Sequence, residues 1–310
     1  MKNKSKIVKI FIVLFLVFSL TGCTKILKDK DKKVVTNELT GQSLTENILC
    51  KPEATETLKK YKENKVDVTK LPKCSEFKIT SGGYEGIWTT IFVKPLAWVI
   101  IKIGEFVHNY GFAVIIITIL IRLVLYPFTK KTAMQSENLS KAKPELDRIE
   151  KKYKNKDQND QSIMMQKSQE MMGIYKTYNI NPMSGCLFSF IQVPLFFAFY
   201  EALNRLPIIF EGRFLGFQLG TSPLTAIGKG HWIYVIFIIL VIGATYLSMK
   251  LNKTAAMSAE QESQMKMMNN IMVIFIGIAS LTISTGIALY WITNNVCTIV
   301  QNLIVKRRKA

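Results

Sequence analysis

A single arginine lies inside an otherwise apolar run. Arg122 stands within residues 112–128, where nearly every other side chain is hydrophobic. A charge in the middle of a membrane helix costs about 2.5 to 3.5 kcal/mol on insertion scales, so it is retained where it faces water, a partner or a functional site. Thr118, Arg122 and Tyr126 are four residues apart, which predicts a polar stripe along a hydrated groove. The alternative is that Arg122 extends its side chain to the membrane surface near Lys130.

The rest of the sequence offers little for catalysis. His108 and His231 are isolated, and no His-Glu-x-x-His zinc motif, P-loop or nucleophile–base pair occurs. We interpret both histidines as residues at the membrane interface. We therefore predict a protein that is not an enzyme and that has no cofactor and no metal site.

The composition is that of a membrane protein. Hydrophobic residues make up 49% of the 310 residues, and they are gathered in long blocks. The formal net charge is +19, and no nucleic-acid-binding motif accompanies it. In such a protein an excess of lysine reports topology and contact with anionic lipids. We predict no sequence-specific binding of nucleic acid.

The first 22 residues have the features of an export signal. Lysines precede the apolar stretch 10–20, and Leu20-Thr-Gly-Cys23 follows it. This pattern resembles a bacterial lipoprotein signal peptide, so we predict that residues 1–22 are removed and that Cys23 is lipidated, with palmitate among its acyl groups. The alternative is an uncleaved signal anchor with a chance cysteine.

Residues 23–83 are polar and show no sustained apolar period. They predict an extracytoplasmic tether or a very small disulfide-closed segment. Disulfides persist outside the cytoplasm, so Cys50 and Cys74 are candidates for a bridge, and two free thiols in a disordered tether are the alternative. Cys186 and Cys297 lie in apolar segments and are interpreted as packing residues.

The long apolar blocks predict an all-α membrane protein with five transmembrane helices. The stretch 84–108 mixes aromatic residues with charges, among them Trp88, Lys94, Trp98, Lys102 and Glu105, and this favours an amphipathic helix lying in the membrane interface. The predicted spans are residues 110–128, 183–203, 231–249, 268–283 and 286–305. Lysines concentrate in the loop 130–180 and in the C-terminal tail, which places both in the cytoplasm by the positive-inside rule.

This lysine-rich loop has the pattern of a mobile helical hairpin. Leu146, Ile149 and Tyr153 recur at helical spacing, and the polar stretch 155–160 separates them from a second helical pattern over 163–178. The second pattern contains Met164, Met165, Met171 and Met172. Exposed methionines suit varied apolar partners, and ordinary packing between the two helices is the alternative.

Three separated stretches occur in order along the chain: Ile121-Arg122-Leu with Tyr126-Pro127, residues 181–200 with Gln192 and Pro194, and residues 289–295 followed by Gln301. Together they resemble the YidC family of membrane insertases. Together with the lipoprotein signal they point to the Gram-positive lipoprotein form, with the insertase domain over residues 84–310. The family often has a proline after the methionines that open the fourth helix, where this chain has Asn269, and another before the glycine of the final hairpin, where it has Thr285 before Gly286. The residues after Cys186-Leu187 also lack a usual proline.

The resemblance implies a groove that is open to the cytoplasm and the lipid but closed to the outside. A hydrophilic client segment would enter this positively charged groove while the client's apolar helix moves into lipid. The implied partners are nascent membrane proteins, with the Sec translocon and the ribosome as further candidates. The implied location is the bacterial cell membrane, with a lipid-anchored N-terminus outside and the C-terminus in the cytoplasm.

The groove wall can be assigned to particular residues. Trp291 begins a series at spacings of four, three and four that ends at Asn302, so these side chains share one helical face. The candidate groove residues are Arg122, Thr118, Gln192, Tyr290, Trp291, Asn294, Asn295, Thr298, Gln301 and Asn302. Such amides also hold membrane helices together, which is the alternative role. The rival function is a solute or ion transporter, although the predicted spans carry no carboxylate in their middles.

Overall fold

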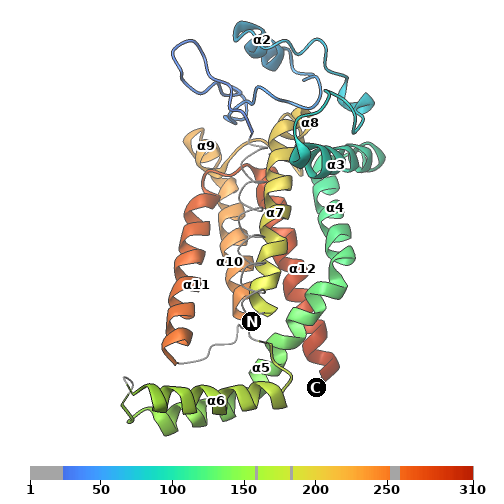
Figure 1. Ribbon diagram of the computed structural model, residues 1–310. Helices are drawn as coiled ribbons and strands as arrows, with labels where there is room; N and C mark the ends of the chain where they lie inside the picture. The colour runs from blue at the N-terminus through green and yellow to red at the C-terminus, as the bar shows by residue number, and fades with distance from the viewer. Residues whose placement is uncertain (1–23, 158–159, 182–183, 252–258, 310) are drawn as a thin grey trace. The chain divides into compact units, whose positions relative to one another are not determined.

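The computed structural model describes residues 24–157, 160–181, 184–251 and 259–309, and most of these residues are helical (Figure 1). The predicted signal peptide and Cys23 lie outside the described residues. The chain divides into two compact units. The first consists of Met1–Thr118, Val193–Ile238 and Ser280–Trp291, and the second of Ile119–Gln192, Ile239–Ala279 and Ile292–Ala310.

The first unit begins with a folded segment of short elements, residues 24–83, which we call the cap. It contains the helix α2 (Thr55–Glu63), the 3₁₀ turn η1 (Cys74–Glu76) and several isolated β-bridges. Cys50 and Cys74 form a disulfide in the structure, with their Cα atoms 4.9 Å apart. The bridge joins the chain just before α2 to the start of η1.

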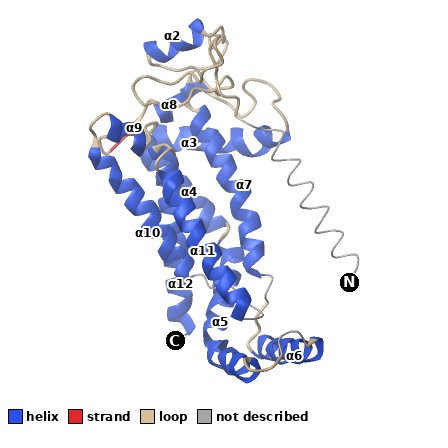
Figure 2. Ribbon diagram, turned by 90° about the vertical axis from the view of Figure 1, so that its left-hand side faces the viewer, coloured by secondary structure: helices blue, strands red, loops and turns tan. Residues whose placement is uncertain are grey.

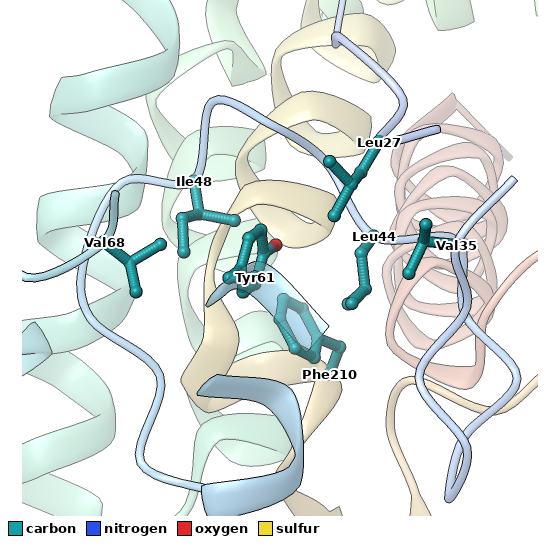
Figure 3. Close-up of a cluster of buried hydrophobic side chains, with 7 residues drawn as sticks. All are labelled: Leu27, Val35, Leu44, Ile48, Tyr61, Val68 and Phe210. Carbon is teal, nitrogen blue, oxygen red and sulfur yellow. The ribbon is translucent and has the colours of Figure 1, made fainter. Parts of the chain in front are cut away.

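The cap has a hydrophobic core, shown in Figure 3. Its buried members are Leu27, Val35, Leu44, Ile48, Tyr61, Val68 and Phe210. Phe210 belongs to the short helix α8 (Pro207–Phe210), far along the chain. The Tyr61 hydroxyl donates to the Thr45 carbonyl at 2.9 Å, and burial raises the pKa of this hydroxyl. Of the two alternatives for this segment, the core favours a small disulfide-closed unit over a loose tether.

Residues 84–108 form the π-helical turn η2 (Thr89–Val93) and the helix α3 (Lys94–Val107). Lys94 and Trp88 were expected at the membrane surface, but the structure buries both. The Lys94 ammonium donates to two backbone carbonyls, and the Trp88 indole donates to the Glu201 carboxylate at 3.0 Å. The polar groups of both residues thus find partners inside the protein. An interfacial position of α3 itself stays a prediction.

Helix α4 (Tyr110–Val124) carries Arg122, and α5 (Tyr126–Tyr153) follows it at an angle of 72°. Pro127 occupies the first turn of α5, where its missing N–H and fixed φ are tolerated, and proline disfavours helical geometry in the residue before it. The predicted first span therefore runs about one turn too far. Tyr126 lies beyond the bend, so it does not extend the Thr118–Arg122 stripe as expected.

Short elements follow the end of helix α7 (Ser184–Arg205) in the first unit. Strand β1 (Arg213–Phe214) pairs antiparallel with β2 (Phe217–Gln218), and Arg213 lies opposite Gln218. The helix α9 (Pro223–Gly228) and the turn η3 (Trp232–Tyr234) come next. We call residues 204–230 the platform, because the cap packs on them.

Helices α5 and α6 (Gln161–Thr177) form a hairpin in the second unit, visible at the lower end of Figure 2. Leu146, Ile149 and Tyr153 are buried between the two helices, as the periodicity indicates. Asp160 caps α6 by accepting two backbone N–H groups. Met171 packs in the hairpin core, whereas Met164 and Met165 are exposed, so each alternative for the methionines applies to part of the set.

Three more long helices follow along the chain: α10 (Val235–Leu251), α11 (Ala259–Ser280) and α12 (Thr285–Lys309).

Few described helices are individually apolar enough to span a membrane. By length and composition Trp232–Leu251 qualifies, and the bent pair of α4 and α5 raises the number to two if it counts as one span. Polar residues inside α7, α11 and α12 lower their mean hydropathy, and in α7 and α12 they include the hydrogen-bond partners of Arg122. The bounds of these helices lie near those of the predicted spans, and five spans remain a prediction.

Candidate functional site

The Arg122 side chain is buried near the end of α4, with 7% of its surface exposed. Its Nε donates a hydrogen bond to Asn294 Oδ1 at 2.7 Å. Its Nη2 donates to Gln192 Oε1 at 3.2 Å. Three helices, α4, α7 and α12, thus contribute to one polar cluster in the second unit. The burial of Arg122 speaks against the alternative that its side chain extends to the membrane surface.

Helix α12 continues this polar face beyond Asn294. The Thr298 hydroxyl donates to the Asn294 carbonyl at 3.1 Å, and the Asn302 amide donates to the Thr298 carbonyl at 3.0 Å. From α5, the Thr129 hydroxyl donates to Gln301 Oε1 at 2.9 Å. These bonds satisfy polar groups that would be costly inside hydrocarbon, and they fix the side chains around Arg122.

A small open pocket lies along this face, with space for about one water molecule. Its lining residues are Arg122, Thr129, Thr132, Ala133, Thr298, Gln301 and Asn302. Sequence reasoning missed the contribution of α5. Thr129, Thr132 and Ala133 are spaced three and four residues apart, so they share one face, and this spacing was the available signal.

The other expected groove residues have different surroundings. In the first unit, Thr118 is buried and its hydroxyl donates to the Val114 carbonyl of its own helix at 2.6 Å. The Tyr290 ring stacks on Phe199 with centroids 4.1 Å apart, and Trp291 meets Phe196 edge to face at 5.2 Å. These three residues, and the half-buried Asn295, are not among the residues that line the pocket.

The chemistry of the site is electrostatic. Asn294 and Gln192 are neutral acceptors, and their two hydrogen bonds orient the Arg122 guanidinium. A fixed cation in surroundings of low dielectric attracts anions more strongly than it would in water. Within the described ranges, no group of three or more histidine, cysteine or carboxylate side chains could hold a metal ion.

Comparison with known proteins assigns the chain to a family. Residues 102–310 match the model of the 60Kd inner membrane protein family. The chain is 35% identical over 246 residues to the membrane protein insertase YidC of Oceanobacillus iheyensis, covering 77% of this chain and 92% of that protein. It is 34% identical to YidC of Alkalihalophilus pseudofirmus, covering 70% and 81% of the two chains. It is 33% identical to the insertase MisCA of Bacillus subtilis, covering 71% and 79%.

A solved structure, described as an active YidC insertase with its first transmembrane domain resolved, has a similar fold. The TM-score is 0.50 at 23% identity, and the alignment covers 81% of this chain. The chain spans about half, 52%, of that longer protein. The family model, the relatives and the shared fold agree, and the chain belongs to the YidC family of membrane protein insertases.

Proposed function

We propose that this protein inserts client membrane proteins by receiving their hydrophilic segments at the Arg122 pocket and releasing their apolar helices into lipid. The observation that carries the proposal is the buried Arg122 guanidinium, held by two neutral amides beside an open pocket. Each unsatisfied polar group in hydrocarbon costs several kcal/mol, so a hydrated polar face lowers the barrier for a client segment. No covalent chemistry is required, and we propose that the protein is not an enzyme.

The charge of Arg122 gives the site a preference among clients. An attraction between unit charges about 4 Å apart is worth about 4 kcal/mol at an effective dielectric constant of 20. Acidic client segments should therefore benefit most from Arg122. Gln192, Asn294, Thr298, Gln301 and Asn302 would serve as hydrogen-bonding partners for the client backbone, and Thr118, Tyr290, Trp291 and Asn295 remain proposed groove residues.

We further propose the membrane arrangement that the charge distribution supports. Five spans would place the cap outside and the α5–α6 hairpin in the cytoplasm, where its lysines satisfy the positive-inside rule. The α3 helix would lie at the outer interface. Cys23 would carry the lipid anchor, and the Cys50–Cys74 disulfide would form outside the cell. The Sec translocon, the ribosome and anionic lipids are proposed partners.

A transporter is the second candidate, because a polar intramembrane pocket could also bind a solute. Transporters commonly couple movement to ionisable carboxylates within the membrane. The residues that line the pocket here are Arg122, hydroxyls, amides and Ala133, which favours a passive polar surface over a coupling site.

The test is client insertion in a strain depleted of its own insertase. Arg122→Ala should reduce insertion of clients with acidic translocated segments about tenfold or more, because it removes the attraction estimated above. Insertion of these clients by Arg122→Lys should fall between that of the wild type and that of Arg122→Ala. An ammonium keeps the charge but cannot reproduce the planar donor geometry. Lys131→Ala is the matched control, an exposed lysine on α5 that should leave insertion unchanged. Normal insertion by Arg122→Ala, at normal protein level on a blot, would reject the groove charge.

A further inference from the structure

Arg205, at the end of α7, binds the cap through both its side chain and its backbone. Its side chain is fully buried, and its Nε donates to the Asn47 carbonyl at 2.6 Å. Its own backbone carbonyl accepts the N–H of Leu49 at 2.9 Å. One residue of the platform thus holds both ends of the same short stretch of the cap.

A second buried cation holds the other end of the cap. The Lys94 ammonium, at the start of α3, donates to the Ser81 carbonyl at 2.7 Å and to the Gly83 carbonyl at 2.5 Å. Glu85 joins the two cations. Its Oε1 lies 3.4 Å from Lys94 Nζ, and its Oε2 pairs with the Arg205 guanidinium. Arg205 is thereby linked to α3 through one carboxylate.

Two further residues of the platform, Lys229 and Glu211, also bind the cap through its backbone. Lys229 Nζ donates to the carbonyls of Glu38 and Leu39 at 2.7 and 3.1 Å. The Glu211 carboxylate accepts the N–H groups of Glu53 and Ala54 at 3.2 and 3.3 Å. Because these partners are main-chain groups, the contacts require the folded path of the cap chain. The Cys50–Cys74 disulfide constrains that path.

We propose that Glu85, Lys94 and Arg205 form a latch that holds the cap on the platform. The Cys50–Cys74 disulfide keeps the latch closed, because it constrains the stretch 47–49 to which Arg205 binds. With the latch closed, the cap stays packed on the platform, and Phe210 is buried in the core of the cap. Opening the latch separates the cap from the platform. The latch does not depend on the Arg122 pocket, and Glu85 and Lys94 precede the residues that match the family model.

Limited trypsin digestion of the full-length protein in lipid nanodiscs tests the latch. The cap carries exposed lysines, including Lys28, Lys32 and Lys33, that the enzyme can cleave when the chain around them opens. Glu85→Gln removes the charge that joins the two cations, so cleavage within the cap should be about tenfold faster, the change expected when a charged hydrogen bond is lost. Glu63→Gln is the control, because Glu63 is an exposed residue on α2 that pairs with Lys59. This control should cleave like the wild type.

A second variant separates a latch from a simple buried-charge penalty. In Glu85→Gln with Lys94→Met, the ammonium that lost its partner is gone, and Arg205 keeps the Glu201 carboxylate at 3.9 Å from its Nη1. A latch predicts that the cap of this double variant is cleaved as fast as that of Glu85→Gln alone. Cleavage that returns to the wild-type rate would show that only an unpaired charge was at work, and would overturn the proposal.

The disulfide is tested with a dithiol reductant on the wild type and with a Cys50→Ser, Cys74→Ser double variant. The dithiol supplies two electrons and two protons, so the bridge becomes two thiols while the reagent becomes a disulfide. Both treatments should speed cleavage of the cap, and reductant should have no further effect on the double variant. A cap that resists trypsin in Glu85→Gln, in the reduced protein and in the serine variant alike would contradict the latch.

Discussion

At the scale of single residues, the proposed function depends on the hydrogen bonds that hold Arg122. The sequence alone identified Arg122, Gln192 and Asn294 as unusual, because polar groups inside apolar runs are rare. It did not distinguish Asn294 from Asn295, since adjacent residues differ by about 100° around a helix and the helix rotation depends on tertiary packing. The structure selects Asn294 as the partner of Arg122.

Asn294 allows the charge of the site to be changed while its shape is retained. Asn294→Asp places a carboxylate beside Arg122 Nε, so the cation is neutralised and insertion of acidic clients should fall with little loss of protein stability. Asn294→Leu removes the acceptor and should destabilise the protein by about 1.5 to 3 kcal/mol, the usual value for a hydrogen bond to a charged group. Insertion assays with thermal unfolding distinguish the two effects. Full activity of Asn294→Asp on acidic clients would argue against an electrostatic role.

At the scale of elements, helical spacing correctly predicted the core of the α5–α6 hairpin. It did not predict where α4 ends or that Lys94 is buried. The bend between α4 and α5 follows from Pro127. The predicted span 110–128 runs across this bend, because the apolar residues continue through it. The buried Lys94 was not predictable from periodicity, because its partners Ser81 and Gly83 are backbone carbonyls in a loop. Such contacts leave no signature in side-chain patterns.

The backbone amides of the α5–α6 hairpin should exchange their hydrogens faster in acid. Hydrogen bonds from Lys152 and from the Tyr153 hydroxyl lower the pKa of Glu170 below its ordinary value of 4.5. A carboxylate whose folded-state pKa is lowered contributes stability above its unfolded pKa, and that stability is lost as pH falls through the folded-state pKa. Hydrogen exchange of the hairpin amides, corrected for intrinsic rates, should accelerate below about pH 4.5. The acceleration should be weaker in Glu170→Gln and unchanged in Glu137→Gln. Equal acid sensitivity in all three proteins would remove Glu170 from the explanation.

Two helical glycines should respond to alanine in opposite directions. A Cβ at Gly104 of α3 would lie 2.1 Å from the Tyr110 ring, so Gly104→Ala must displace the turn between α3 and α4. Overpacking of this kind costs about 1 to 3 kcal/mol. A Cβ at Gly173 of α6 would meet no atom within 4 Å, so Gly173→Ala should stabilise the helix by up to about 1 kcal/mol. Thermal unfolding in one detergent measures both, and a stabilised Gly104→Ala protein would contradict the packing described for this turn.

At the scale of the whole molecule, the sequence predicted a helical membrane protein of the YidC family, and the comparisons confirm the family. It left the cap undecided, because Leu27, Leu44 and Tyr61 follow no regular period and their core is completed by Phe210, far along the chain. Long-range packing of this kind is invisible to local patterns. The lipid anchor at Cys23 and the five spans stay predictions of the sequence.

The exported state of the cap can be measured directly. Non-reducing peptide mapping of protein purified from membranes should recover Cys50 and Cys74 in one linked peptide pair, because disulfides persist outside the cytoplasm. Mass spectrometry of the same sample should find a lipidated Cys23 at the mature N-terminus. Two alkylated thiols at positions 50 and 74 would place the cap in a reducing compartment and would contradict the proposed orientation.

The central claim is that hydrophilic client segments pass along the Arg122 pocket. The most direct measurement is site-specific photocrosslinking to a stalled nascent membrane protein, with the probe at Asn302 in the pocket or, as control, at Ile274, an exposed apolar residue of α11. The probe at Asn302 should capture the hydrophilic translocated segment, and the probe at Ile274 should not. Capture of that segment at Ile274 with none at Asn302 would contradict a path along the pocket.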